Sequence, residues 1–147
     1  MKISRKIISK DNPVYESQAK FLALCILQLD ERTKRIKFDP DDKNDVRDFW
    51  KLPEYIIFHD ATYACGFVCN DYSPDFNINA ANINSKNIIS KASFEELRHY
   101  IHTLMRAERS NQMDGYFSPV LKAVLSDALT LVAIRLNSDD ELYEIEM

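Results

Sequence analysis

A stripe of ionisable side chains runs along residues 94–109, a segment with helical spacing. At about 100° per residue, the stripe contains Glu95, His99, His102, Arg106 and Arg109. Imidazole and guanidinium groups on one face can bind a phosphate, a carboxylate or an acidic partner, and a histidine among them can act as acid, base or pH sensor. We therefore take His99, His102, Arg106 and Arg109 as candidate binding residues. The alternative is an ordinary solvated helix face with one Glu95–His99 pair.

Glu108 lies on the other side of this segment, in the middle of its apolar stripe. A carboxylate in that position needs an ion partner or must take up a proton. We expect a buried structural ion pair, and Arg98 and Arg135 are both candidates for the partner. Two further interpretations stay open. The last helical turn could fray and free the carboxylate, or Glu108 could be catalytic.

Start signals and apolar spacing predict the helices that position these residues. A helix is expected to start at Asn12-Pro13, with an apolar surface broad enough for deep burial. A second is expected from Asp41 or Asp42 to just before Pro53. A third helix is expected to start with a capping box at 93–96 and to reach about residue 109. A fourth is expected to start with a cap and a proline at 118–119.

Short apolar runs predict a small sheet beside the helices. Residues 35–38 and 67–69 are expected as strands. Strand and helix compete over 56–58 and over 129–136. We therefore predict an α+β fold, mainly helical with a small sheet, in a single compact domain over 1–147.

Three segments differ in composition from the rest of the domain. Residues 1–11 form a basic N-terminal arm, and 137–147 form an acidic tail. Residues 70–90 are rich in asparagine, which favours turns, and are expected to form a long surface loop.

The glycine content excludes several cofactor-binding classes. The chain holds only two glycines, Gly66 and Gly115, so it cannot build the glycine-rich loops of dinucleotide-binding or P-loop proteins. Cys65, Cys69, His99 and His102 match no familiar zinc spacing. We expect no cofactor and no metal.

Charge and hydropathy indicate the compartment. The 147 residues carry a formal net charge of −4, which does not favour whole-chain attraction to nucleic acid or anionic lipid. No secretory signal and no membrane-spanning stretch is expected, and the three cysteines follow no disulfide framework. We expect a cytoplasmic protein with reduced thiols.

One part of the chain resembles a known family. Residues 97–109, the following Asp114-Gly115 and an apolar segment ending at Arg135-Leu136 are similar to the C-terminal half of a bacterial family catalogued only as a domain of unknown function. The shared pattern is a helix ending in Arg-x-acid-Arg, then a glycine, a short helix and a final apolar segment with Arg-Leu.

The chain departs from that pattern after the helix. Ser110 stands where the family has an aromatic residue, and residues 111–113 are an insertion. The resemblance implies that Arg106, Glu108 and Arg109 form a recurring element, and it implies no activity.

Together, these observations favour a small bacterial or phage-type protein without enzymatic activity, a binding or regulatory module that contacts a macromolecule. A protein is the expected partner. Nucleic-acid binding through the basic N-terminus with Arg106 and Arg109 is one alternative. A small enzyme that uses Glu108 with His99 or His102 is another.

Overall fold

The fold is helical throughout the part of the chain described by the computed structural model, residues 14–68, 83–115 and 117–143. The elements are α1 (Glu16–Ile36), α2 (Lys43–Trp50), α3 (Pro53–Ala64), α5 (Lys86–Lys91), α6 (Phe94–Asp114), α7 (Pro119–Leu125), α8 (Ala128–Ser138) and a short 3₁₀ helix η1 (Asp140–Tyr143).

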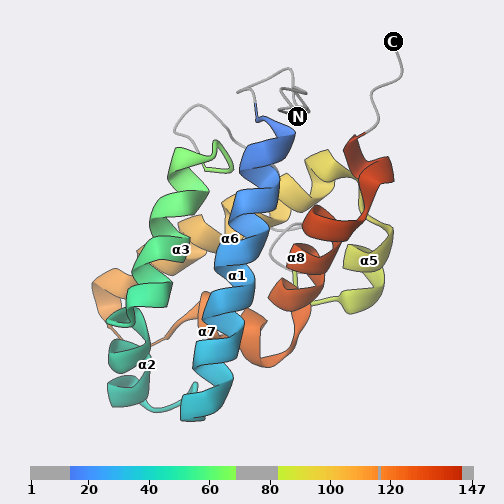
Figure 1. Ribbon diagram of the computed structural model, residues 1–147. Helices are drawn as coiled ribbons and strands as arrows, with labels where there is room; N and C mark the ends of the chain where they lie inside the picture. Colours follow the sequence, from blue (N-terminus) through green and yellow to red (C-terminus); the bar gives the residue numbers. More distant parts are fainter. Residues whose placement is uncertain (1–13, 69–82, 116, 144–147) are drawn as a thin grey trace.

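Helix α1 lies between α3 and α8, and α6 crosses behind them (Figure 1). Both α3 and α8 run in the opposite direction to α1, while α5 packs against α8 and α7 joins α6 to α8. The core forms where these helices meet. From α1 it receives Leu22, Ile26 and Leu29, all fully buried, and burial of each such side chain contributes roughly 1.5–3 kcal/mol.

The apolar stripe predicted for α1 is present, but the helix is not deeply buried all round. Ala19 is fully buried with the three core residues above, whereas Phe21 is 48% and Leu24 53% exposed. These two exposed side chains lie outside the buried stripe of the helix. The start expected at 12–13 lies outside the described residues, and the helix begins at Glu16 after the N-cap Tyr15.

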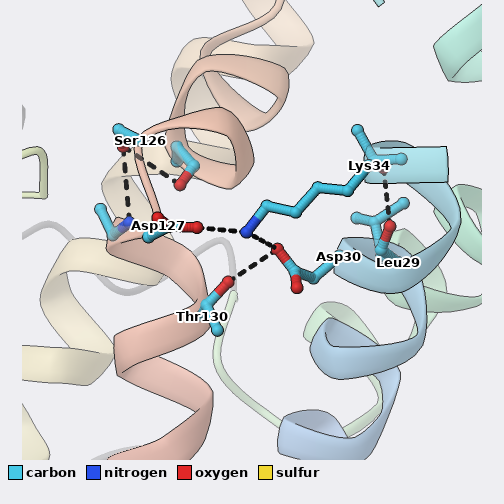
Figure 2. Close-up of polar contacts among 9 residues, drawn as sticks. Leu29, Asp30, Lys34, Ser126, Asp127 and Thr130 are labelled. Atoms are coloured by element: carbon cyan, nitrogen blue, oxygen red, sulfur yellow. Dashed lines mark hydrogen bonds and ion pairs between the residues drawn. The ribbon is translucent and has the colours of Figure 1, made fainter. Parts of the chain in front are cut away.

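A polar cluster fixes the register of α1 against the start of α8 (Figure 2). Lys34 Nζ lies 2.8 Å from Asp30 Oδ1 and also contacts Asp127 Oδ1. Thr130 Oγ1 donates to the same Asp30 oxygen at 2.8 Å. Asp127 precedes α8 in a left-handed conformation with φ of 66°, so the turn between α7 and α8 is held against α1.

The predicted sheet is wrong, since no strand occurs among the described residues. Residues 35–36 continue α1 instead of starting a strand. The pairs Asp30–Lys34 and Glu31–Arg35 are four residues apart, a spacing that favours a helix. The helix ends only at Lys37, which has a left-handed φ of 62°.

Residues 67–68, expected as part of a strand, are turn-like, and the two runs left open between strand and helix are helical. Residues 56–58 lie in α3, and the backbone N–H groups of Phe67 and Val68 both donate to the Thr62 carbonyl in a turn after that helix. Cys69 lies outside the described residues. Residues 129–136 lie in α8, where Leu129, Val132 and Leu136 are fully buried at helical spacing, which outweighs the strand preference of β-branched residues.

The compositional segments are described only in part. The basic arm, residues 1–11, lies outside the described residues, as does 69–82. Residues 70–90 are expected to form a loop, but within their described part, 83–90, residues 86–90 belong to α5. Residues 137–143 of the acidic segment include the end of α8 and η1, and Tyr143 there is buried with its hydroxyl bonded to the Leu136 carbonyl.

The caps predicted around the candidate site are confirmed. The Ser93 hydroxyl accepts from Glu96 N, and the Glu96 carboxylate accepts from Ser93 N, at the start of α6. Ser118 caps α7 in the same way by accepting from Leu121 N. Helix α6 extends beyond the predicted end to Asp114 and stops at Gly115, whose left-handed φ of 78° suits glycine.

Candidate functional site

Glu108 is fully buried in the last third of α6, and its carboxylate accepts from four neutral donors. Trp50 Nε1 lies 3.1 Å and the Tyr55 hydroxyl 2.9 Å from Oε2. On the α7 side, the Ser118 hydroxyl lies 2.8 Å from Oε2 and 2.9 Å from Oε1, and Val120 N lies 3.4 Å from Oε1. The carboxylate therefore joins α2, α3, α6 and α7 at one point.

The cationic partner expected for Glu108 is not among these contacts. Arg98, although fully buried, donates from Nη2 to the Gly66 carbonyl at 2.8 Å. Arg135 bonds to the carbonyls of Ile89 and Ala92 and to Asp139. Both guanidinium groups therefore serve other parts of the fold. Sequence spacing could not exclude them because it shows only that a residue is cationic, not which backbone carbonyls surround it.

Burial without a counter-charge changes the acidity of this cluster. Desolvation raises the pKa of Glu108 above its ordinary value, although the hydrogen bonds from Ser118, Tyr55, Val120 and Trp50 oppose it. Burial and the neighbouring Glu108 charge also raise the pKa of the Tyr55 hydroxyl. The phenol thus stays protonated and able to donate to the carboxylate.

Gln112 connects the buried cluster to an open groove between α3 and α6. Its side-chain Nε2 donates to the Tyr55 hydroxyl at 2.7 Å. The groove has a volume of about 610 Å³, and we call it the α3–α6 groove. It is lined by His59, Asp60, Tyr63, Ala64, Arg109 and Gln112.

Along α3, next to the groove, aromatic rings in tilted contact alternate with polar side chains. The rings of Tyr55, His59 and Tyr63 follow one another at four-residue spacing, with centroids 6.1 and 5.2 Å apart. His59 Nδ1 lies 3.4 Å from Asp60 Oδ1. These residues are absent from the candidates chosen on sequence, but their four-residue spacing on a helix was the signal that could have found them.

The four candidate binding residues of α6 do not form one continuous exposed face. Arg106 and Arg109 are exposed and His99 is partly exposed, but His102 is only 4% exposed. Burial, with the charges of Arg106 and Arg98 beside it, lowers the pKa of His102 to about 4. Of the four, only Arg109 lines the α3–α6 groove.

The three residues of the proposed recurring element, Arg106, Glu108 and Arg109, also differ in exposure. Glu108 points into the core, whereas Arg106 and Arg109 on either side of it are exposed. His99 lies 4.0 Å from Glu95, and its pKa is lowered by burial. The donors that surround the Glu108 carboxylate in the described part of the chain are the four above, and neither histidine is one of them.

Among the described residues, no group of three or more histidine, cysteine or acidic side chains is placed to hold a metal ion. None of the helices described there has the length and apolarity needed to cross a bilayer.

The chain was also compared with known proteins. Comparison with protein families, curated proteins and solved structures finds no match.

Proposed function

We propose that this chain is a protein-binding module without enzymatic activity, and that its α3–α6 groove takes up an acidic side chain or carboxyl terminus of the partner. Arg109 is the principal contact in this proposal. Its guanidinium group would pair with the carboxylate, and Gln112 and His59 would supply neighbouring polar groups.

The observation that carries the proposal is the state of Arg109. It is exposed, it lines the groove, and it makes no ion pair with any described residue. Other arginines of the chain already have acidic neighbours: Arg32 has Glu54, Arg35 has Glu31 and Arg135 has Asp139. An arginine at the wall of a groove, without an ion partner among the described residues, is suited to a carboxylate from another molecule.

The groove favours a protein carboxylate over a nucleic-acid backbone. Asp60 lines the same groove, with its side chain 75% exposed, and would repel a run of phosphates. The net charge of −4 acts in the same direction. A single carboxylate next to Arg109 avoids most of that repulsion, because it can lie away from Asp60.

The arrangement of Glu108 argues against its use as a catalytic group. The carboxylate is fully buried and is surrounded by donors from three other elements. A general acid or base must reach its substrate directly or through one water molecule. The α3–α6 groove is therefore better supported as a binding site than the buried cluster is as an active site.

A peptide-display selection tests the proposal because it requires no candidate partner. Peptides selected on the wild-type chain, with counter-selection on an Arg109→Glu variant, are expected to be enriched in Asp, Glu or a free carboxyl terminus. Arg109→Ala should weaken the binding of a selected peptide about tenfold. The matched control is Arg35→Ala, which changes an exposed arginine of α1 and should leave the affinity unchanged.

Two outcomes would contradict the proposal. One is a set of selected peptides without acidic groups, or with affinities that do not depend on Arg109. The other is tighter binding of a labelled oligonucleotide than of any selected peptide, with a steep salt dependence that falls in the Arg106→Ala and Arg109→Ala variants. The second result would assign the site to nucleic acid.

A further inference from the structure

We propose that a second cavity, between α6, the start of α7 and the turn before α5, binds a small organic acid with an apolar body. This site does not depend on the α3–α6 groove, and it uses different residues of α6. Its volume is about 290 Å³, near the lower end of the roughly 300–1,000 Å³ typical of small-molecule sites. It is also more enclosed than the α3–α6 groove.

The walls of the cavity are mainly apolar. They include Ile83, Leu104, Ala107, Phe117 and Pro119. These side chains come from three parts of the chain and leave a space that they do not fill. An apolar cavity of this size favours a hydrocarbon or aromatic group, because its burial removes apolar surface from water.

Lys122 places a positive charge at the same cavity. Its ammonium group lies 4.8 Å from the centre of the Phe117 ring, and no described acidic side chain forms an ion pair with it. Lys34, by contrast, is held by two aspartates. A carboxylate that entered the cavity would supply a counter-charge to this ammonium group, although Lys122 is exposed and water screens part of the attraction.

Thr103 adds a polar group that the fold does not use. The residue lines the cavity and is 2% exposed, and its hydroxyl makes no hydrogen bond within the described part of the chain. Threonines inside helices commonly bond to a carbonyl one turn earlier. A buried hydroxyl without a partner is unfavourable, but this oxygen has almost no accessible surface, so a ligand oxygen would bond to it only after the neighbouring side chains shift.

These features select a ligand with one anionic end. The apolar walls favour a short aliphatic or aromatic body, and Lys122 favours a carboxylate over a neutral or cationic group. The enclosure limits the ligand to a small molecule, in contrast to the side chain of a folded partner proposed for the α3–α6 groove.

Titration with matched acids and amides tests this inference on the full chain. The probes are hexanoate, benzoate, phenylacetate and 4-phenylbutyrate, each compared with its neutral amide by isothermal titration calorimetry and by amide chemical shifts in NMR. At least one acid should bind saturably, shift the resonances of Thr103, Leu104 and Lys122, and bind about tenfold more tightly than its amide.

Three variants separate the contributions of charge and space. Lys122→Gln should remove the preference for the acid over the amide, whereas Lys51→Gln, at an exposed lysine after α2, should not. Ala107→Leu should fill the cavity and abolish binding of both, with circular dichroism showing that the helices remain. If no acid binds saturably, if acid and amide bind equally, or if Lys122→Gln leaves the preference intact, the inference is overturned.

Discussion

The hydroxyl of Tyr55 donates a hydrogen bond of 2.9 Å to the carboxylate of Glu108, a residue 53 positions further along the chain. This bond connects α3 to α6, and through Gln112 it also connects the buried cluster to the α3–α6 groove. The acid is therefore a structural centre whose described contacts are neutral donors, and its contribution to stability is open to direct measurement.

Removal of the carboxylate should destabilise the protein strongly. Glu108→Ala leaves three buried donors and the half-buried Trp50 indole without their acceptor and creates a cavity, so we expect a loss of about 3–5 kcal/mol in the free energy of unfolding. Urea unfolding measures this loss. The control is Glu31→Ala, at a 65% exposed carboxylate, which should change stability by less than about 0.5 kcal/mol. Equal effects of the two substitutions would refute a structural role for Glu108.

The pH dependence of stability should reveal the raised pKa of Glu108. A raised pKa means that the folded chain binds the proton more tightly than the unfolded chain. The contribution of this group is therefore fully present below the ordinary value of 4.5 and is lost as pH rises through the folded-state pKa. Relative to Glu108→Gln, wild-type stability should increase as pH falls from neutral towards 4.5, and a flat difference would contradict the shift.

His102 should produce the opposite trend. Its pKa falls from 6.5 to about 4, so the folded chain binds this proton less tightly than the unfolded chain. Stability should therefore decline as pH falls through this window, by about 3 kcal/mol in total. In urea unfolding at a series of pH values, the free energy of unfolding of His102→Gln should fall less steeply with decreasing pH than that of the wild type. If stability falls equally steeply with pH in wild type and variant, His102 does not titrate in this way.

Gly115 should be required for the end of α6. Because its φ is 78°, Gly115→Ala should lower the free energy of unfolding by about 1 kcal/mol. A Cβ there would lie 3.5 Å from Arg47 Nη2, which is ordinary contact, so the cost is in the backbone. Asparagine tolerates this conformation better, and Gly115→Asn should cost less. If thermal unfolding shows that Gly115→Ala is more stable than Gly115→Asn, this explanation is contradicted.

The two aspartates around Lys34 should contribute unequally. Asp30 is 17% exposed and also accepts from Thr130, whereas Asp127 is 53% exposed. Double-mutant cycles with Lys34→Ala should give a coupling of about 0.5–1 kcal/mol for Asp30 and less for Asp127, because exposed pairs are screened by water and salt. A larger coupling for Asp127 would reverse this assignment.

The helix starts near the site could be predicted from the sequence because their signals are local. Ser93 with Glu96, and Ser118 with Pro119, act over three or four residues and form the expected caps. The inward direction of Glu108 followed from the same short-range geometry. The helical conformation of 129–136 could not be predicted this way, since packing against α1 decides it.

The partners of the site residues depend on contacts between distant segments. Trp50 is 58 residues from Glu108, and no local pattern connects them. The burial of His102 likewise depends on neighbours that include the turn at Phe67, whose backbone forms a hydrogen bond with it. Spacing along α6 showed which side chains share a face, but not which part of that face another segment covers.

The separations of Glu108 from its partners bear on the order in which the molecule assembles. Ser118 is only 10 residues away, whereas Tyr55 and Trp50 are 53 and 58 residues away. Closing the short loop costs less chain entropy than closing the long one. The contact between α6 and α7 should thus give the acid its first partner during folding, and the docking of α2 and α3 should then add the remaining donors and establish the native topology.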